Sequence, residues 1–137
     1  MRLILDTNVI VSALIQRGYP YYIVDTIFAD SSLQLCISDK LMAEYVEVLN
    51  RQKFSRFPDF HARAQSLLSE IENRSAKYKP AHTVAVIKDE PDNRLLELAE
   101  TCKADYLITG NANDFTMTMY KSTRIVSPKN FFEILNS

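Results

Sequence analysis

The sequence of 137 residues contains only two glycines, five prolines and two cysteines, and each scarcity excludes a class of protein. With 47% hydrophobic residues and so little glycine and proline, the chain is neither disordered nor collagen-like. Cys36 and Cys102 lie in apolar, periodic segments without CxxC or Cys-His spacing, which predicts reduced core cysteines. We therefore expect a single globular domain over residues 1–137.

Long hydrophobic runs are also missing. No stretch approaches the roughly 20 apolar residues that a membrane-spanning helix needs. The apolar N-terminus is interrupted at Asp6 and no small-residue cleavage site follows, so we expect neither a signal peptide nor membrane association. His61 and His82 lack the spacing of zinc ligands. The expected location is the cytoplasm.

No excess of one charge marks the chain as a nucleic-acid binder, because 16 Lys and Arg stand against 17 Asp and Glu, a net charge of -1. This sum conceals an uneven distribution. Residues 51–88, the basic segment, hold eight basic against three acidic side chains, or +5, and the rest hold eight against fourteen, or -6. A basic segment on an acidic body calls for an explanation.

The start of the basic segment alternates cations with aromatic side chains. Arg51, Lys53 and Arg56 are interleaved with Phe54 and Phe57, a pattern typical of proteins that bind single strands through phosphates and bases. We expect the three cations to contact RNA. The pattern is equally compatible with phenylalanines that belong to the core and cations that only face solvent where the chain turns between two helices.

Apolar periodicity predicts alternating strands and helices. Strands are expected at residues 2–5, 33–37, 106–109 and 124–126. Helices are expected at 9–15 (beginning at 7 or 8 and stopped by Gly18), 20–30, 38–51, 59–73, 92–103 and 128–135, with Arg94, Glu97 and Glu100 facing water. Short apolar strands separated by helices predict an α/β domain with a mostly parallel sheet.

Three acidic side chains are candidates for one edge of this sheet, where α/β proteins bind ligands. Asp6 directly follows the first strand, although it could instead cap the next helix. Glu44 borders an apolar helix stripe and could equally be an exposed helix-edge acid, whereas Glu47 on the far side is expected in water. Asp92 faces the core side of the first turn of its helix, where the helix dipole alone would favour an acid.

A glycine and three Asx residues follow the strand at 106–109. Gly110, Asn111, Asn113 and Asp114 could be simple turn chemistry, or they could complete an oxygen-rich site. Carboxylates that meet repel one another unless a cation joins them, and all-oxygen ligation suits Mg²⁺ or Mn²⁺. A magnesium or manganese site is therefore a hypothesis for this edge.

Four segments carry a family resemblance in their order and spacing. They are Leu5-Asp6-Thr7-Asn8-Val9, Ser38-x-x-Leu41-x-x-Glu44, Asp92-x-x-Leu95-Leu96-x-x-Ala99 and Ala104-Asp105-Tyr106-Leu107-Ile108-Thr109-Gly110-Asn111-x-x-Asp114-Phe115. Together they resemble the PIN-domain ribonucleases, in particular the group described as toxin components of bacterial and archaeal toxin–antitoxin systems. The resemblance covers nearly the whole chain.

The resemblance implies a three-layer fold with a central, mostly parallel sheet flanked by helices, and an endoribonuclease that depends on Mg²⁺ or Mn²⁺. The implied site residues are the catalytic acids Asp6, Glu44 and Asp92, the further metal ligands Asn111 and Asp114, and the supporting Asn8 and Thr109. Asn111 departs from the family, since many members carry Asp there. One charge fewer puts occupancy by a second metal in question.

Partners are also implied by the resemblance: an RNA substrate, a second copy in a homodimer, and a small antitoxin of a type II system. The aromatic segment 19–28 could form an interface, or its helical spacing could mean plain core. Asn111 motivates an alternative, a catalytically weak PIN-fold protein that binds RNA or a partner. A receiver domain would need Lys near the end of the last strand, where the chain is a poor match, and Asn8 disfavours an Asp-x-Asp phosphatase.

Overall fold

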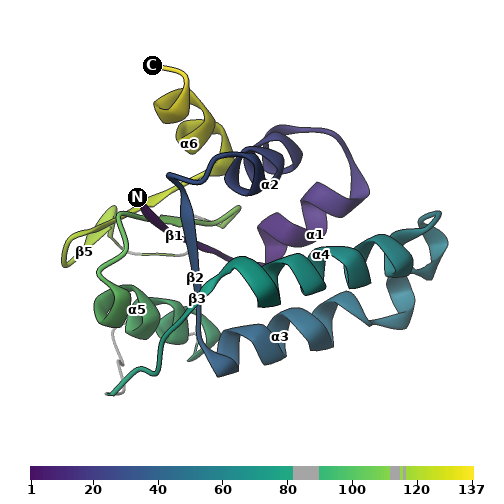
Figure 1. Cartoon of the computed structure of the whole chain (residues 1–137), viewed down its shortest axis with the longest axis horizontal. Coiled ribbons are helices and arrows are strands. Elements are labelled where there is room, and N and C mark those ends of the chain that lie inside the picture. The colour runs from purple at the N-terminus through teal and green to yellow at the C-terminus, as the bar shows by residue number, and fades with distance from the viewer. Residues whose placement is uncertain (82–89, 112–114, 116) are drawn as a thin grey trace.

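The computed structural model describes residues 1–81, 90–111, 115 and 117–137, and within them six strands form one sheet in the order β3-β2-β1-β4-β6-β5 (Figure 1). The strands are β1 (Arg2–Leu5), β2 (Gln34–Ile37), β3 (Ala76–Lys77), β4 (Tyr106–Ile108), β5 (Met119–Tyr120) and β6 (Thr123–Val126). All neighbouring strands pair in parallel except β5 and β6. The predicted α/β class with a mostly parallel sheet is confirmed.

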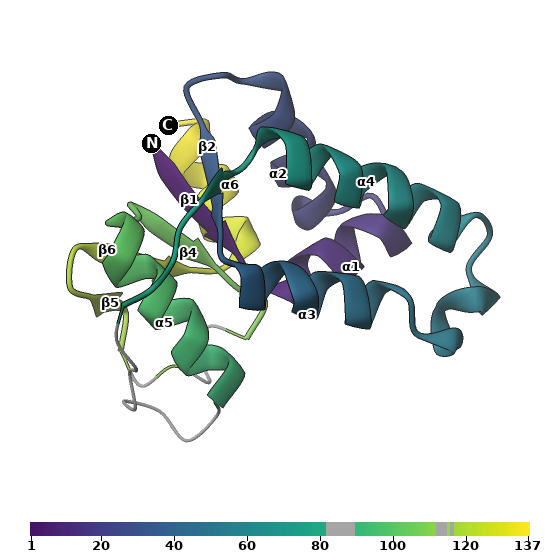
Figure 2. The ribbon, with the colours of Figure 1, turned by 60° about the horizontal axis from the view of Figure 1, so that its bottom comes forward.

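Helices cover both faces of the sheet. They are α1 (Thr7–Ile15), α2 (Tyr19–Ala29), α3 (Asp39–Leu49), the 3-10 helix η1 (Gln52–Arg56), α4 (Phe60–Arg74), α5 (Glu90–Cys102) and α6 (Pro128–Leu135). Figures 1 and 2 show α5 on one face and α1, α2 and α6 on the other, which gives the expected three layers. The helices α3 and α4, joined by η1, extend together away from the sheet as an arm.

The central position of β1 follows from its composition. Leu3, Ile4 and Leu5 are fully buried, as expected for a strand covered on both faces, where a continuous apolar run is stable. Cys36 and Cys102 are also fully buried and form no disulfide, so the prediction that they are core residues is confirmed. Within the described part of the chain, no helix combines the length and apolar character that crossing a membrane requires.

Two serines fix the starts of α3 and α6. Ser38 Oγ accepts the Leu41 N–H at 3.1 Å, and Ser127 Oγ accepts the Asn130 N–H at the same distance, as N-capping predicts. The predicted last residue of α1, Ile15, is confirmed, but the role of Gly18 as its stop residue is wrong. The C-cap of α1 is Gln16, and Gly18 is the N-cap of α2.

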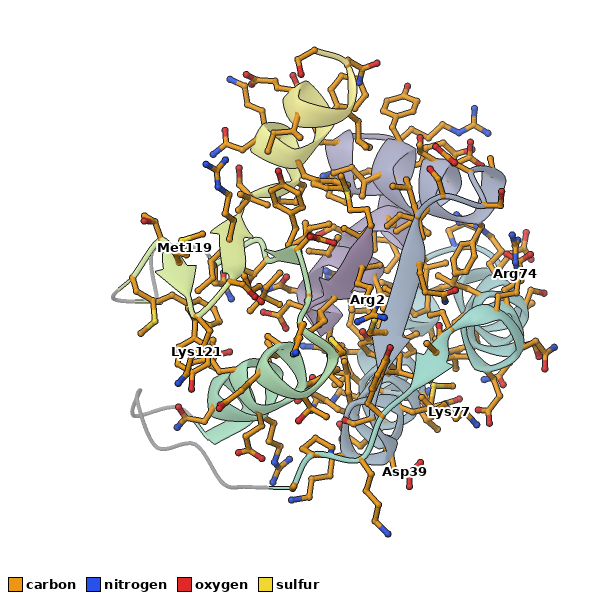
Figure 3. The ribbon with its side chains drawn as sticks, turned by 60° about the vertical axis from the view of Figure 1, so that its left-hand side comes forward. Arg2, Asp39, Arg74, Lys77, Met119 and Lys121 are labelled. Atoms are coloured by element: carbon orange, nitrogen blue, oxygen red, sulfur yellow. The ribbon has the colours of Figure 1, made fainter. Side chains whose placement is uncertain are left out.

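The sequence reading missed β3 and β5, which lie at opposite edges of the sheet; Figure 3 labels Lys77 on β3 and Met119 on β5. The expectation that Glu97 faces water is wrong, because its side chain is only 9% exposed; it lines one hollow together with Tyr78 and Lys79 of the segment after β3. Arg94 and Glu100 are half-buried rather than exposed.

Candidate active site at the carboxyl edge of the sheet

Asp6 lies at the carboxyl end of the central strand, at the N-cap position of α1. Its side chain makes no capping hydrogen bond, so the simpler interpretation as a helix cap is not what the structure shows. The Thr109 hydroxyl donates to Asp6 Oδ2 at 2.8 Å, and the Asn8 amide donates to the same oxygen at 3.5 Å. With 8% exposure, the Asp6 carboxylate is a buried charge held by neighbouring side chains.

The turn after β4 provides these contacts. Thr109 is buried, and its hydroxyl also accepts the Asn111 N–H at 3.1 Å. Gly110 donates its N–H to Asn8 Oδ1 at 3.1 Å. A Cβ on Gly110 would lie 3.3 Å from that same oxygen, so a glycine allows the close approach of the two chain segments. The ends of β1 and β4 are thereby joined by side-chain hydrogen bonds.

Glu44 comes to this edge from α3. The Thr7 hydroxyl, one residue after Asp6, donates to Glu44 Oε2, and the Glu44 side chain is half-buried. Glu47 is exposed, and its Oε2 lies 2.9 Å from Arg51 Nη2. The prediction that Glu47 points into water is confirmed. Glu44 and Glu47 therefore differ as expected, one at the sheet edge and one in water.

Tyr45 places α3 against the end of β1. Its ring is fully buried, and its hydroxyl donates to the Leu5 carbonyl at 2.5 Å. Burial, and then the negative charges of Asp6 and Glu44, raise the pKa of the Tyr45 phenol well above its usual range. Both carboxylates therefore act on one buried phenol, which stays protonated and keeps its hydrogen bond.

Asp92 is half-buried in the first turn of α5, a helix that packs against β1 and α3. Asn111 is exposed, and Asp114 lies outside the described residues. Among the residues that the structure describes, no three His, Cys, Asp or Glu side chains converge into a group able to hold a metal ion. The structure connects Asp6 and Glu44 through their neighbours, and the role of Asp92 stays a prediction.

The donor chemistry at this edge fits a divalent cation. Asp6 and Glu44 offer carboxylate oxygens, and the hydroxyls of Thr109 and Thr7 each donate to one of them, which fixes their orientation. Hard oxygen ligands of this kind suit Mg²⁺ or Mn²⁺. The residues are compatible with the implied metal at this edge.

The interpretation of Phe54 as a base-stacking platform is wrong. Phe54 and Phe60 are buried and stack on each other, with ring centroids 4.7 Å apart. The Lys53 ammonium lies 5.3 Å from the centre of the Phe54 ring, and the Arg56 guanidinium 4.9 Å from that of Phe57. A buried, stacked ring has no face for a base, so the core interpretation holds.

The three cations of this corner lie at the distal end of the arm, where η1 joins α3 and α4 (Figure 2). Arg51 is engaged with Glu47 through two hydrogen bonds, at 3.2 and 2.9 Å. Lys53 and Arg56 are exposed. RNA contact by these three cations stays a prediction.

Sequence reasoning missed two residues that organise the edge, Thr7 and Tyr45. Thr7 stood in the quoted Leu-Asp-Thr-Asn motif, and its position next to Asp6 was a usable signal. By helical spacing, Tyr45 belongs to the apolar stripe that Glu44 borders, and such a position predicts only a core residue. Only the fold shows that its hydroxyl reaches Leu5, 40 residues away in the chain.

Fold and site together define an α/β domain with a carboxylate-bearing edge where parallel strands end. A family model described as "PIN domain" matches residues 2–113. The chain therefore belongs to the PIN-domain family. PIN domains are generally nucleases and generally use divalent metal ions.

A curated relative gives no further detail of function. An uncharacterized protein of Methanocaldococcus jannaschii is 26% identical over 142 residues, an alignment that covers 97% of this chain and 90% of that one. No solved structure matches the chain.

Proposed function

We propose that this PIN domain is a metal-dependent endoribonuclease that hydrolyses phosphodiester bonds of RNA at the edge formed by Asp6, Glu44 and Asp92. The observation that carries the proposal is the anchoring of two carboxylates at one edge: Thr109 donates to Asp6, and Thr7 donates to Glu44. Charged side chains at a sheet edge that are buried and oriented by partners indicate a functional site.

The residues of the chain would act by position. Asp6 and Glu44 would hold Mg²⁺ or Mn²⁺, with Asp92 and the Asn111 carbonyl as further oxygen donors. When bound, the cation lowers the pKa of a water molecule and neutralises charge on the phosphate. Thr109, Thr7 and Asn8 limit the freedom of the carboxylates, so less reorganisation is needed during the reaction.

Cleavage of a labelled single-stranded RNA with Mn²⁺ tests the proposal. Asp6→Asn, Glu44→Gln and Asp92→Asn should each reduce cleavage by at least about 100-fold, because each removes a charge that holds the cation. Glu47→Gln is the matched control on the same helix: it removes an exposed acid and should leave cleavage within about twofold. Circular dichroism checks that every variant is folded. Undiminished cleavage in Asp6→Asn and Asp92→Asn would refute the assignment.

The second candidate function is a binding protein without effective catalysis. The amide of Asn111, at a position where many members carry Asp, favours it because the edge then has one negative charge fewer. Single-turnover assays over a range of Mg²⁺ and Mn²⁺ concentrations distinguish the two functions. A binding protein shifts the mobility of RNA and forms no product.

We further propose that the nuclease is the toxin of a type II toxin–antitoxin system, acts in the cytoplasm and is neutralised by a small antitoxin. The support is the resemblance of the motifs to that group. Expression of the chain should arrest growth, and Asp6→Asn should abolish the arrest. A neighbouring reading frame for a small DNA-binding protein would identify the antitoxin, and its product should restore growth when expressed together with the wild type.

A further inference from the structure

A polar hollow lies at the opposite end of α1 from Asp6. It has a volume of about 560 Å³ and is lined by Ala13, Ile15, Gln16, Arg17, Tyr21 and Arg63, which come from α1, the turn after it, α2 and α4. None of these residues is acidic. A hollow with two guanidinium groups and no carboxylate in its lining is a favourable place for an anion.

Both arginines of this hollow are held in place. The Arg17 guanidinium lies 5.3 Å from the centre of the Tyr21 ring, and Arg63 Nη1 donates to the Leu14 carbonyl at 2.9 Å in the last turn of α1. Each guanidinium carries five N–H donors, so a single such bond leaves Arg63 others for a ligand. Pre-positioned guanidinium groups bind phosphate with little loss of side-chain entropy.

The two arginines of the hollow differ in their ion pairing from three cations of the basic segment. Arg51, Arg74 and Lys77 form ion pairs with Glu47, Glu70 and Glu72. No ion pair of Arg17 or Arg63 occurs within the part of the chain that the structure describes. Their charge is therefore available to a ligand, whereas much of the charge along α4 is compensated.

The surface of α1 connects this hollow with the candidate active site. Asn8, Ser12 and Ile15 are spaced i, i+4 and i+7, which places them on one side of the helix, and all are half-buried or exposed. Asn8 contacts Asp6, and Ile15 lines the hollow. Seven residues of α-helix span about 10 Å, a distance that a few nucleotides of a single strand can bridge.

We propose that the hollow formed by Gln16, Arg17, Tyr21 and Arg63 binds a phosphate of the RNA strand whose scissile bond lies at Asp6. This inference rests on the proposed function and adds a substrate-binding subsite to it. An acidic edge repels RNA, so the strand needs cations within a few nucleotides of the cleaved bond. Arg63 and Tyr21 also line the adjoining apolar hollow, which contains Asp25 and Glu70, so repulsion by these acids favours a phosphate on the side of Arg17.

Binding of a fluorescein-labelled single-stranded RNA of twelve nucleotides, followed by anisotropy in EDTA at several KCl concentrations, tests this subsite without catalysis. Arg17→Gln should weaken binding about tenfold and reduce the slope of log K against log salt by about 0.7, the value of one phosphate contact on a single strand. Arg63→Gln should do the same. Arg17 is the decisive variant, because Arg63 also bonds to the Leu14 carbonyl and its loss can disturb the fold.

The matched control is Arg74→Gln, which removes the same charge from an arginine that is paired with Glu70 at the other end of α4 (Figure 3). It should change RNA affinity less than about twofold. Unchanged affinity and salt slope in Arg17→Gln would overturn the subsite. An effect of Arg17→Gln on binding of an oligo-aspartate peptide but not of RNA would also overturn it, in favour of a peptide site.

The outcome is separable from that of the proposed function. Wild-type protein that binds RNA through Arg17 but yields no product with Mn²⁺ supports the subsite and refutes the nuclease. Cleavage that depends on Asp6 together with RNA affinity that is independent of Arg17 supports the nuclease and overturns the subsite.

Discussion

The hydroxyl of Thr109 donates to Asp6 and accepts from the Asn111 N–H, so one buried atom connects two candidate ligand positions. Thr109→Val keeps the shape and removes both bonds. We expect a loss of about 1–3 kcal/mol in the free energy of unfolding. Mn²⁺ affinity should fall about 10- to 100-fold, as is usual when the partner of a metal ligand is removed. Urea denaturation and calorimetric titration measure the two quantities.

The control for this prediction is Thr123→Val. Thr123 is equally buried and donates to the Ala104 carbonyl, with no contact to a carboxylate. Loss of this hydrogen bond should lower the free energy of unfolding by a similar amount and leave Mn²⁺ affinity unchanged. Equal Mn²⁺ affinity in Thr109→Val and Thr123→Val would contradict a role for Thr109 in orienting Asp6.

The two glycines of the chain predict different responses to the same substitution. Gly110→Ala places a Cβ 3.3 Å from Asn8 Oδ1, so Asn8 has to move, whereas the Cβ of Gly18→Ala meets only Pro20 Cδ at 3.8 Å. Displacing Asn8 misplaces a partner of Asp6. We expect Gly110→Ala to reduce RNA cleavage about tenfold and Gly18→Ala to leave it unchanged. Thermal denaturation separates this effect from unfolding; equal cleavage by the two variants would contradict the role of Asn8.

At the scale of elements, Tyr45 packs α3 against the end of β1. The contribution of its hydrogen bond to the Leu5 carbonyl can be measured separately from that of its ring. Tyr45→Phe keeps the ring and removes the hydroxyl. We expect a loss of about 0.5–1.5 kcal/mol in the free energy of unfolding near neutral pH. Urea denaturation in EDTA measures it.

The raised pKa of the Tyr45 phenol predicts a dependence of stability on alkaline pH. Above pH 10 the phenol ionises in the unfolded chain and stays protonated in the folded one, so the unfolded state binds fewer protons and stability falls as pH rises. This contribution is intact below about pH 10 and amounts to about 1.4 kcal/mol per pH unit above it. Unfolding free energies from pH 9 to 11 should fall less steeply for Tyr45→Phe than for the wild type. Parallel curves would contradict the burial of this phenol.

Element boundaries were predictable where a local signal exists. Ser38 caps α3, and capping is decided by neighbouring residues, so the start of this helix was found from sequence. The strands β3 and β5 are two residues long and lie at the edges of the sheet, too short for any periodicity.

The candidate site was predictable to a similar extent. The edge position of Asp6 and the opposite directions of Glu44 and Glu47 follow from strand order and helix geometry. The contacts that orient the acids, Thr7 to Glu44 and Thr109 to Asp6, join residues 37 and 103 positions apart and depend on the fold. Helical periodicity likewise could not reveal that Phe54 stacks on Phe60, because the two residues belong to different elements.

At the scale of the whole molecule, the distribution of charge is less uneven than the sequence suggests. Arg51 is compensated by Glu47 from outside the basic segment, and Arg74 and Lys77 by Glu70 and Glu72 from within it. Arg17, which lies outside the segment, joins Arg63 in one hollow. The surface suited to an anion therefore depends on which cations are unpaired rather than on the +5 of a stretch of sequence.

We propose that the homodimer implied by the family resemblance forms through the exposed surface of α2 and α6. Ile23 and Ile27 of α2 are buried, so the core interpretation holds for them, but Tyr19 and Tyr22 are 42% and 47% exposed. Both rings lie beside Phe132 of α6, with centroids 5.2 and 6.4 Å from it. Exposed neighbouring aromatic side chains are typical of interface cores.

Tyr22→Glu tests this interface, because a carboxylate buried between two copies lacks a partner and costs more than the aromatic contact contributes. Light scattering on a size-exclusion column should give twice the 15.7 kDa chain mass for the wild type and the single mass for Tyr22→Glu. Met119→Glu is the control, since Met119 is 51% exposed on β5 at the edge of the sheet, as Figure 3 shows. A monomeric wild type contradicts the dimer, and a dimeric Tyr22→Glu contradicts its location. Dissociation by Met119→Glu alone would place the interface at β5.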